Sequence, residues 1–295
     1  MAIEIYCDAG SNLYPPILKK KNLNIHVLSM SLDVAGKTYH CYEDDIDIKA
    51  FSKSFYKDIK ENKKVTTTLI NPYRFMEAFE EEFKKGNDVI CFTMAKGISG
   101  TYQAACMAKN ELDNKYPDRK LAIIDSRTAG FGEGLQAIHA YELCQKETNF
   151  DEIVKNCNDF VLKVRSEFTV DNIKYLARTG RVSSIVARLA RLLNIKVMLK
   201  GSDESKIVST GKVQGRKMSI KSLAKTCLQN IVNPDEQTIY IAHCDDIEAA
   251  NKLKELLVEG GIKESVIEIY DYDVVTGAHV GPGALAIFYV GNNRN

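Results

Sequence analysis

The sequence predicts a two-domain α/β protein: an N-terminal domain with a parallel sheet, packed on a second α+β domain with a mostly antiparallel sheet. The first domain is indicated by short apolar runs that alternate with segments of helical periodicity. Strands joined by crossover helices form parallel sheets. The second domain is indicated by a change in sequence pattern after about residue 164, where strand-like runs and turns become more frequent. We expect domains at 1–160 and 161–295, with a ligand crevice between them.

Each element of the N-terminal domain follows from a local pattern. Apolar runs predict strands at residues 3–7, 25–32, 89–92 and 120–126. Helical spacing predicts helices at 13–20, 46–60, 73–85, from 100 onward, 134–145 and 151–165. Pro72 suits the first turn of a helix, and Ala35 with Gly36 indicates a hairpin turn.

The second domain is expected to begin with a short strand and a short helix that ends at Gly180. An amphipathic helix and another strand follow, up to about residue 199. Polar residues alternate with valine around Gly211, which favours a hairpin over residues 206–215. Strands are then predicted at 238–244, 266–272 and 284–290, and helices at 219–232 and 247–259.

Composition narrows the functional classes. The chain has 295 residues, 45% of them hydrophobic, and 40 Lys and Arg against 39 Asp and Glu give a net charge of +1. This balance provides no overall field to attract nucleic acid or an anionic membrane. The eight cysteines show no metal-like spacing, so we expect reduced thiols and no metal site. Because no signal-peptide pattern and no run long enough to span a membrane are found, we expect a cytoplasmic protein.

The most distinctive segment is DVICFTMAKGISGTYQAACMA at residues 88–108. A buried strand runs into a short turn, and a helix begins close to Gly100. Ser99 is then expected at the N-cap, where its hydroxyl and the free N–H groups of Gly100 and Thr101 would face the crevice. Such a helix start suits an anion, and the simpler interpretation is that Ser99 only caps its helix.

Three other residues are suited to contact with an anion. His279 is expected in a glycine-rich loop within VVTGAHVGPGALAIF, and glycines let a backbone approach a ligand closely. Thr67, the middle of three successive threonines, offers a hydroxyl, although threonine is also common in ordinary strands. Arg181, in ARTGRVSS, could clamp a carboxylate or phosphate or contact a partner protein. A lone histidine in a loop is more often an ordinary surface residue.

In the order and spacing of its motifs, the chain resembles the DegV family. The matching segments are CDAGSNL near the N-terminus, TTT near residue 67, ISGTYQAA at 98–105, IIDS at 123–126, YLARTGRVSS at 175–184 and GAHVGPGALAIF at 277–288. The combination of ISGTY and GAHVGPGAL is the most specific part. The resemblance covers nearly the whole chain and implies a two-domain bacterial lipid-binding protein. Some members of the family serve as the fatty-acid-binding subunit of fatty acid kinase.

The resemblance further implies a long-chain fatty acid between the domains, with its carboxylate held by Thr67, Ser99 and His279. Charge-assisted hydrogen bonds of this kind are each worth roughly 1.5–3 kcal/mol. The buried chain would add about 0.8 kcal/mol per methylene, so most of the affinity would come from the tail. We expect Gly100 to contribute its N–H at the helix start, and Arg181 to contact a kinase or an acyl phosphate. No cofactor is expected, since the chain has no nucleotide-binding motif.

The sequence departs from the family pattern in a basic stretch. A segment often written KVRGRKK is KVQGRKM here, with Gln214 and Met218 in place of an arginine and a lysine. The sequence therefore leaves open whether a fatty acid kinase partner exists.

Two alternative functions remain at this level. A serine-dependent acyl hydrolase would use Ser99 and His279 with an acid such as Asp8 or Asp125 as a triad. Against it, Ser99 lacks a GxSxG elbow. A binder of a small anion would instead require a short polar cleft.

Overall fold

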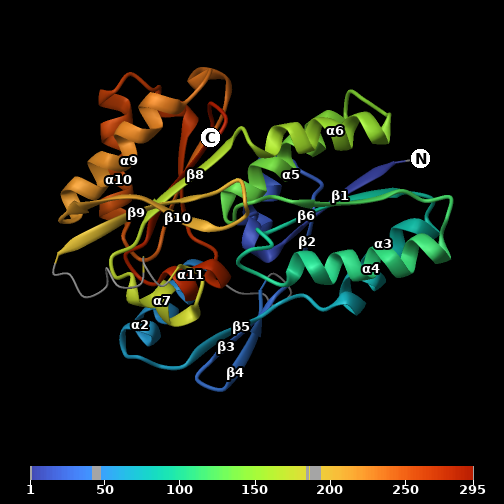
Figure 1. The fold of residues 1–295 in the computed structure, drawn as a ribbon, viewed down its shortest axis with the longest axis horizontal. Helices are drawn as coiled ribbons and strands as arrows, with labels where there is room; N and C mark the ends of the chain where they lie inside the picture. The colour runs from blue at the N-terminus through green and yellow to red at the C-terminus, as the bar shows by residue number, and fades with distance from the viewer. Residues whose placement is uncertain (1, 42–47, 184–185, 187–193, 295) are drawn as a thin grey trace.

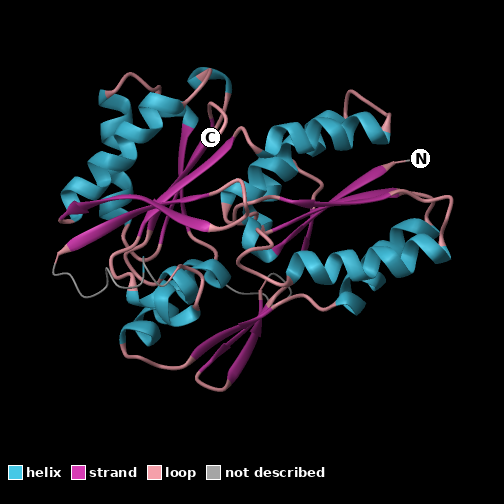
Figure 2. Ribbon diagram, in the orientation of Figure 1, coloured by secondary structure: helices cyan, strands magenta, loops and turns pink. Residues whose placement is uncertain are grey.

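The computed structural model describes residues 2–41, 48–183, 186 and 194–294. Two large sheets lie side by side, each with helices packed against it, and a small third sheet lies below them in the view (Figures 1 and 2). We call residues 2–161 the N-terminal half and residues 164–294 the C-terminal half. The fold class predicted from the sequence is confirmed, whereas the division into separate domains at residue 160 stays a prediction.

A parallel four-stranded sheet forms the centre of the N-terminal half, with strand order β2-β1-β6-β7. Its strands are β1 (Ile3–Asp8), β2 (His26–Leu28), β6 (Asp88–Thr93) and β7 (Leu121–Asp125). The helices are α1 (Pro15–Lys21), α3 (Pro72–Lys84), α4 (Thr101–Lys115), α5 (Phe131–Cys144) and α6 (Phe150–Val161). Figure 1 shows α5 and α6 on one face of the sheet and α3 and α4 on the other. Every residue of β6 is therefore buried.

The C-terminal half contains a six-stranded sheet of order β10-β9-β8-β13-β11-β12, in which only the β11–β12 pair is parallel. Its strands are β8 (Val164–Thr169), β9 (Ile195–Gly201), β10 (Ile207–Gln214), β11 (Ile239–His243), β12 (Ile267–Asp271) and β13 (Leu285–Val290). The helices α9 (Arg216–Asn230) and α10 (Ile247–Glu259) pack together against this sheet.

A group of short elements lies below the two large sheets in the view of Figure 1. The small antiparallel sheet consists of β3 (Ser31–Val34), β4 (Lys37–His40) and β5 (Val65–Thr68), and α2 (Ile48–Lys60) follows β4. From the C-terminal half come α7 (Lys174–Thr179) and α11 (Val274–Val280). Helix α11 packs against α7, β5 and α2, so it lies where both halves meet.

Three sequence predictions of local structure were wrong. Residues 25–32 form two strands of different sheets, β2 and β3, because the chain leaves the parallel sheet after Leu28. The hairpin expected around Gly211 is one strand, β10, with a β-bulge between Ser209 and Gly211. The glycine-rich loop expected around His279 is the helix α11, which ends at Gly281. The first residues of the helix predicted at 46–60, and most of the amphipathic helix predicted after Gly180, lie outside the described residues.

One hydrophobic cluster spans both halves, and a second lies within the C-terminal half. Asn12, in the left-handed conformation, joins the two halves because its amide donates to Asp271 O at 3.1 Å and its carbonyl accepts from Asp273 N at 2.7 Å. Phe131 of the N-terminal half stacks on Tyr240 of the other, with ring centroids 4.2 Å apart. These contacts leave little freedom for the halves to separate at this joint.

Gly130 provides a test of how tightly the joint is packed. Its φ is +63°, and a Cβ there would lie 2.9 Å from ring atoms of both Phe288 and Tyr272. We expect Gly130→Ala to lower the free energy of unfolding by about 2–4 kcal/mol, since backbone strain and overpacking add. Gly36→Ala is the control, because Gly36 has φ +87° but open space around it, and it should lose only about 1–2 kcal/mol. Equal losses in chemical denaturation would contradict a tightly packed joint.

Candidate functional site

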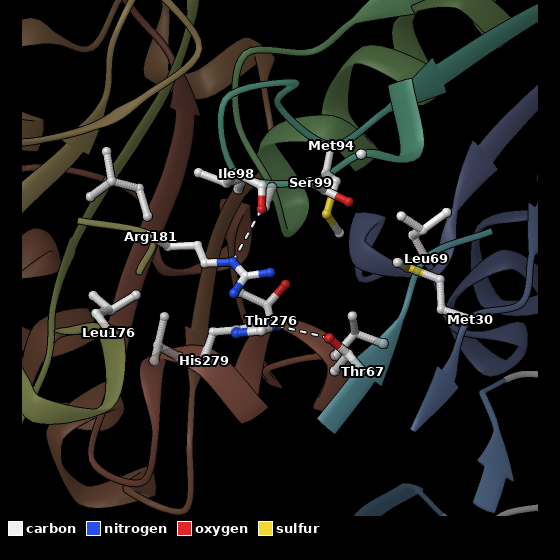
Figure 3. A pocket seen from close by; sticks show the side chains of 15 residues that line it. Met30, Thr67, Leu69, Met94, Ile98, Ser99, Leu176, Arg181, Thr276 and His279 are labelled. Carbon is white, nitrogen blue, oxygen red and sulfur yellow. Dashed lines mark hydrogen bonds between the residues drawn. The ribbon is translucent and has the colours of Figure 1, made fainter. Parts of the chain in front are cut away.

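The residues predicted from the sequence to bind a ligand line one pocket between the two halves. Thr67, Ser99, Gly100, Arg181 and His279 all contribute to its wall, together with apolar side chains from both halves. They come from β5, the β6–α4 loop, the segment after α7, and α11. Figure 3 shows Thr67 and His279 on one side, Ser99 across from them, and Arg181 reaching in between. That they bind a ligand remains a prediction.

Thr67 and His279 are joined directly. The hydroxyl Oγ1 of Thr67 lies 2.9 Å from Nε2 of His279, a hydrogen bond drawn in Figure 3. Helix α11 holds the imidazole in place because Asp273 caps its first turn, accepting from Thr276 N at 2.6 Å. A Cβ at Gly277 would lie 2.2 Å from the hydroxyl of Tyr56, so only glycine fits at this position of α11. The helix can therefore pack closely against α2.

His279 is a neutral imidazole at neutral pH. Burial lowers its pKa from 6.5 to about 4, and the positive charge of Arg181 adds to this effect. Its Nδ1 is buried and has no hydrogen-bond partner among the described residues. The ring can thus offer one donor and one acceptor without carrying a charge.

Helix α4 starts one residue later than predicted, because its N-cap is Gly100 and Ser99 precedes the cap. The hydroxyl of Ser99 nevertheless accepts from Thr101 N at 3.2 Å and lies 2.8 Å from Thr101 Oγ1. The prediction of Ser99 as the N-cap was therefore wrong by one position. The hydroxyl still lines the pocket at the start of α4, which is where the chain has backbone N–H groups to offer.

The loop that carries Ser99 is fixed by three consecutive backbone amides. Met94 N donates to Asp8 Oδ2 at 2.8 Å, and Lys96 N donates to Asp125 Oδ1 at 3.2 Å. Between them, Ala95 N donates to the carbonyl of Thr128 at 2.7 Å. Strands β1 and β7, which flank β6 in the sheet, thus supply the carboxylates that hold this loop.

Arg181 brings a positive charge to the pocket. Its Nε donates to Ile98 O at 3.3 Å, and its Nη1 donates to Thr179 O. These bonds leave part of the guanidinium facing the pocket, as Figure 3 shows. No carboxylate among the described residues forms an ion pair with Arg181, so its charge is available to attract an anion.

A second cavity adjoins the pocket. The two share Ile98, Ala129, Ile207, Thr276 and Val280 in their walls. The second cavity continues between the halves to Phe168 and Tyr272. The first cavity contains the hydroxyls, the imidazole and the guanidinium, whereas the second is mostly apolar.

Sequence reasoning missed Thr276, which lines both cavities. It stands three residues before His279 on α11, so both side chains lie on the same face of the helix. The three-residue spacing of Thr276 and His279 indicates a shared face only on a helix, and a glycine-rich loop was expected there instead.

A family model described as "Uncharacterised protein, DegV family" matches residues 2–292. The chain belongs to the DegV family. A DegV domain-containing protein of Clostridium perfringens is 35% identical over 291 residues, which covers 98% of each chain. The membership inferred from the motifs is thereby confirmed.

Solved DegV structures share the fold. A fatty acid binding DegV family protein from Streptococcus agalactiae has a TM-score of 0.84 and 24% identity, with 99% of this chain and 100% of that chain covered. The fatty acid kinase (Fak) B3 protein of Streptococcus pneumoniae, solved with linoleic acid, has a TM-score of 0.81 and 20% identity with the same coverage. At these identities the likeness establishes the fold alone.

The hydrolase triad considered for this DegV protein is not assembled. Asp8 accepts from the backbone amides of Gly10 and Met94, and Asp125 accepts from Ser205 Oγ and two backbone amides. Within the described ranges, no carboxylate pairs with His279. A histidine without an orienting acid is poorly suited to activate a serine.

Two features of the described residues bear on other functions. No group of three or more His, Cys, Asp or Glu side chains in this part of the DegV chain could hold a metal ion. None of the described helices is long and apolar enough to cross a membrane.

The neutral state of His279 can be measured by NMR titration of the imidazole. We expect a midpoint near pH 4 for the ligand-free protein, with the signal assigned by its loss in His279→Gln. Since the folded-state pKa is depressed, the unfolded chain binds more protons between pH 4 and 6.5. Stability should therefore fall as pH drops through this window, by at most about 3 kcal/mol. A midpoint near 6.5, or an equal loss in His279→Gln, would contradict the burial of a neutral ring.

Proposed function

We propose that this DegV protein is a non-enzymatic carrier that binds one long-chain fatty acid between its two halves in the cytoplasm. Its carboxylate would be held by Thr67, Ser99 and His279, with the N–H of Gly100 nearby. The observation that carries the proposal is the convergence of these residues, far apart in sequence, on one pocket that adjoins a mostly apolar cavity. We infer that the two cavities form a single passage, polar at one end and apolar beyond it.

The polar end of the passage has the chemistry of an anion site. Thr67 and Ser99 provide hydroxyls, and His279 can donate one N–H. Arg181 supplies positive charge from the side of the pocket. A carboxylate that accepts several such hydrogen bonds is stabilised by roughly 1.5–3 kcal/mol for each.

The apolar end of the passage favours a tail over a small anion. Ile98, Ile207 and Val280 line its middle, and Phe168 lies beyond them. Each buried methylene contributes about 0.8 kcal/mol. Ligand selection would then depend on the head group, and affinity mainly on the chain. The fold is shared with a fatty acid binding DegV family protein and with a fatty acid kinase (Fak) B3 protein loaded with linoleic acid, which supports this assignment.

We further propose that the carrier presents its ligand to a separate fatty acid kinase. Arg181 would contact the kinase or the acyl phosphate, because it is the cation at the polar end of the pocket. The likeness to the S. pneumoniae fatty acid kinase (Fak) B3 protein supports such a role. Met218, on α9, is 50% exposed, so a partner that required a lysine there would bind this chain less well.

Mass spectrometry tests the proposal directly. The protein, purified under native conditions from a bacterial host, should release about one fatty acid per chain into organic solvent. The length and saturation of the released fatty acid would indicate the length and shape of the passage. An empty extract, both before and after incubation with added fatty acids, would contradict the carrier function and favour a small-anion binder.

Substitutions at the polar end test the head-group assignment. Ser99→Ala and His279→Ala should each weaken fatty acid binding about 10- to 100-fold, since one charge-assisted hydrogen bond is lost. Circular dichroism should show an intact fold. Ser54→Ala is the matched control, because its hydroxyl lies on the exposed surface of α2 and bonds Phe51 O of the same helix. Unchanged affinity in both site variants would remove the assignment, and turnover of an activated acyl ester that depends on Ser99 would favour the hydrolase.

A further inference from the structure

The turn between β9 and β10 reaches from the C-terminal half onto the N-terminal half. It spans residues 202–206 and is closed by its own backbone, with Ser202 N donating to Lys206 O at 2.8 Å and Ser205 N to Ser202 O at 3.1 Å. Figure 1 shows the β9–β10 hairpin extending toward the parallel sheet. Ser205 at its tip is 1% exposed and has a φ of +62°, which is unusual for a residue with a side chain.

Ser205 fastens this turn to the other half. Its hydroxyl donates to Asp125 Oδ2 at 2.5 Å, and the other oxygen of Asp125 accepts from Lys96 N and Arg127 N. Among the described residues, this is the side-chain hydrogen bond that links the turn to the N-terminal half. Asp125 thus connects the turn with the loop that carries Ser99.

The turn lies directly on that loop. A Cβ at Gly97 would be only 2.1 Å from the carbonyl oxygen of Ser205, so a side chain at this position would push the turn away. Gly201 and Lys206, at the two ends of the turn, line the second cavity, and the next residue, Ile207, lines both cavities. Lys206 of the turn and its flanking residues Gly201 and Ile207 therefore form part of the wall beside which the apolar tail would lie.

We propose that this turn is a gate through which the acyl chain enters and leaves sideways. The inference rests on the proposed fatty acid ligand. A chain that entered lengthwise at the polar end would instead pass Arg181, whose guanidinium is bonded to the carbonyls of Ile98 and Thr179. Lifting the turn breaks the Ser205–Asp125 bond and uncovers the passage along its side. The joint around Asn12 can stay intact during this movement.

A gate has a kinetic signature that a simple supporting contact lacks. If the ligand passes only through the open form, association and dissociation rates both scale with the population of that form. Weakening the fastening then raises both rates by the same factor, and the dissociation constant stays unchanged. A contact that merely stabilises the bound complex would change the dissociation rate and the affinity together.

Stopped-flow fluorescence with cis-parinaric acid, a fluorescent fatty acid, tests the gate. We expect Ser205→Ala to raise both rates about tenfold, with the dissociation constant within about twofold of wild type. Gly97→Ala should act in the same direction by displacing the turn. Ser209→Ala is the matched control, because Ser209 is exposed on the same hairpin and its hydroxyl bonds Gly211 O, away from the N-terminal half.

Three outcomes would overturn the gate. Unchanged rates in Ser205→Ala and Gly97→Ala, with wild-type affinity, would mean that the chain passes on the Arg181 side. A faster dissociation rate with an equal loss of affinity would reduce the turn to a supporting contact. If neither cis-parinaric acid nor palmitate binds the wild-type protein, the proposed function fails, and the gate fails with it.

Discussion

Three aspartates hold the backbone segments on which the site depends. Asp8 binds Met94 N, Asp125 binds Lys96 N, and Asp273 binds Thr276 N, each through a carboxylate oxygen. The first two fix the loop that carries Ser99, and the third caps the helix that carries His279. Because carboxylate-to-amide hydrogen bonds are about twice as strong as neutral ones, short segments can be held without long regular structure.

Burial disfavours the charged form of these carboxylates. Asp8 and Asp273 are at most 1% exposed, and burial raises the pKa of Asp8 to about 6 and that of Asp273 to about 7. Their backbone hydrogen bonds act in the opposite direction and keep the rise in pKa smaller than burial alone would make it. With their oxygens directed at amides, Asp8 and Asp125 serve architecture, which explains why neither orients His279 as a catalytic acid would.

Much of the fold could be predicted from the sequence, because its signals are local. The apolar run at β6 and the pairing of β3 with β4 through Ala35 and Gly36 follow from short-range pattern and turn chemistry. The errors arose where tertiary packing decides. Gly277 suggested a loop, yet it permits a helix to pack against Tyr56, and Gly211 forms a bulge because β9 continues beside it.

The candidate site was predictable in its residue types but not in its geometry. Thr67 and His279 are separated by 212 positions, and no periodicity could indicate that their side chains lie 2.9 Å apart. The depressed pKa of His279 likewise depends on burial, which arises only when the two halves close around it.

The neutrality of His279 determines how an anion could be bound at this pocket. A protonated imidazole beside Arg181 would place two positive charges in a largely buried space, and their repulsion contributes to the low pKa of the ring. The positive charge of the pocket therefore resides on Arg181 alone among its described lining residues, and hydroxyls and a neutral ring are among its other polar groups. An incoming carboxylate would oppose this repulsion and raise the pKa of His279. Ligand binding and proton uptake by the imidazole would then favour each other, and both depend on how closely the two halves pack.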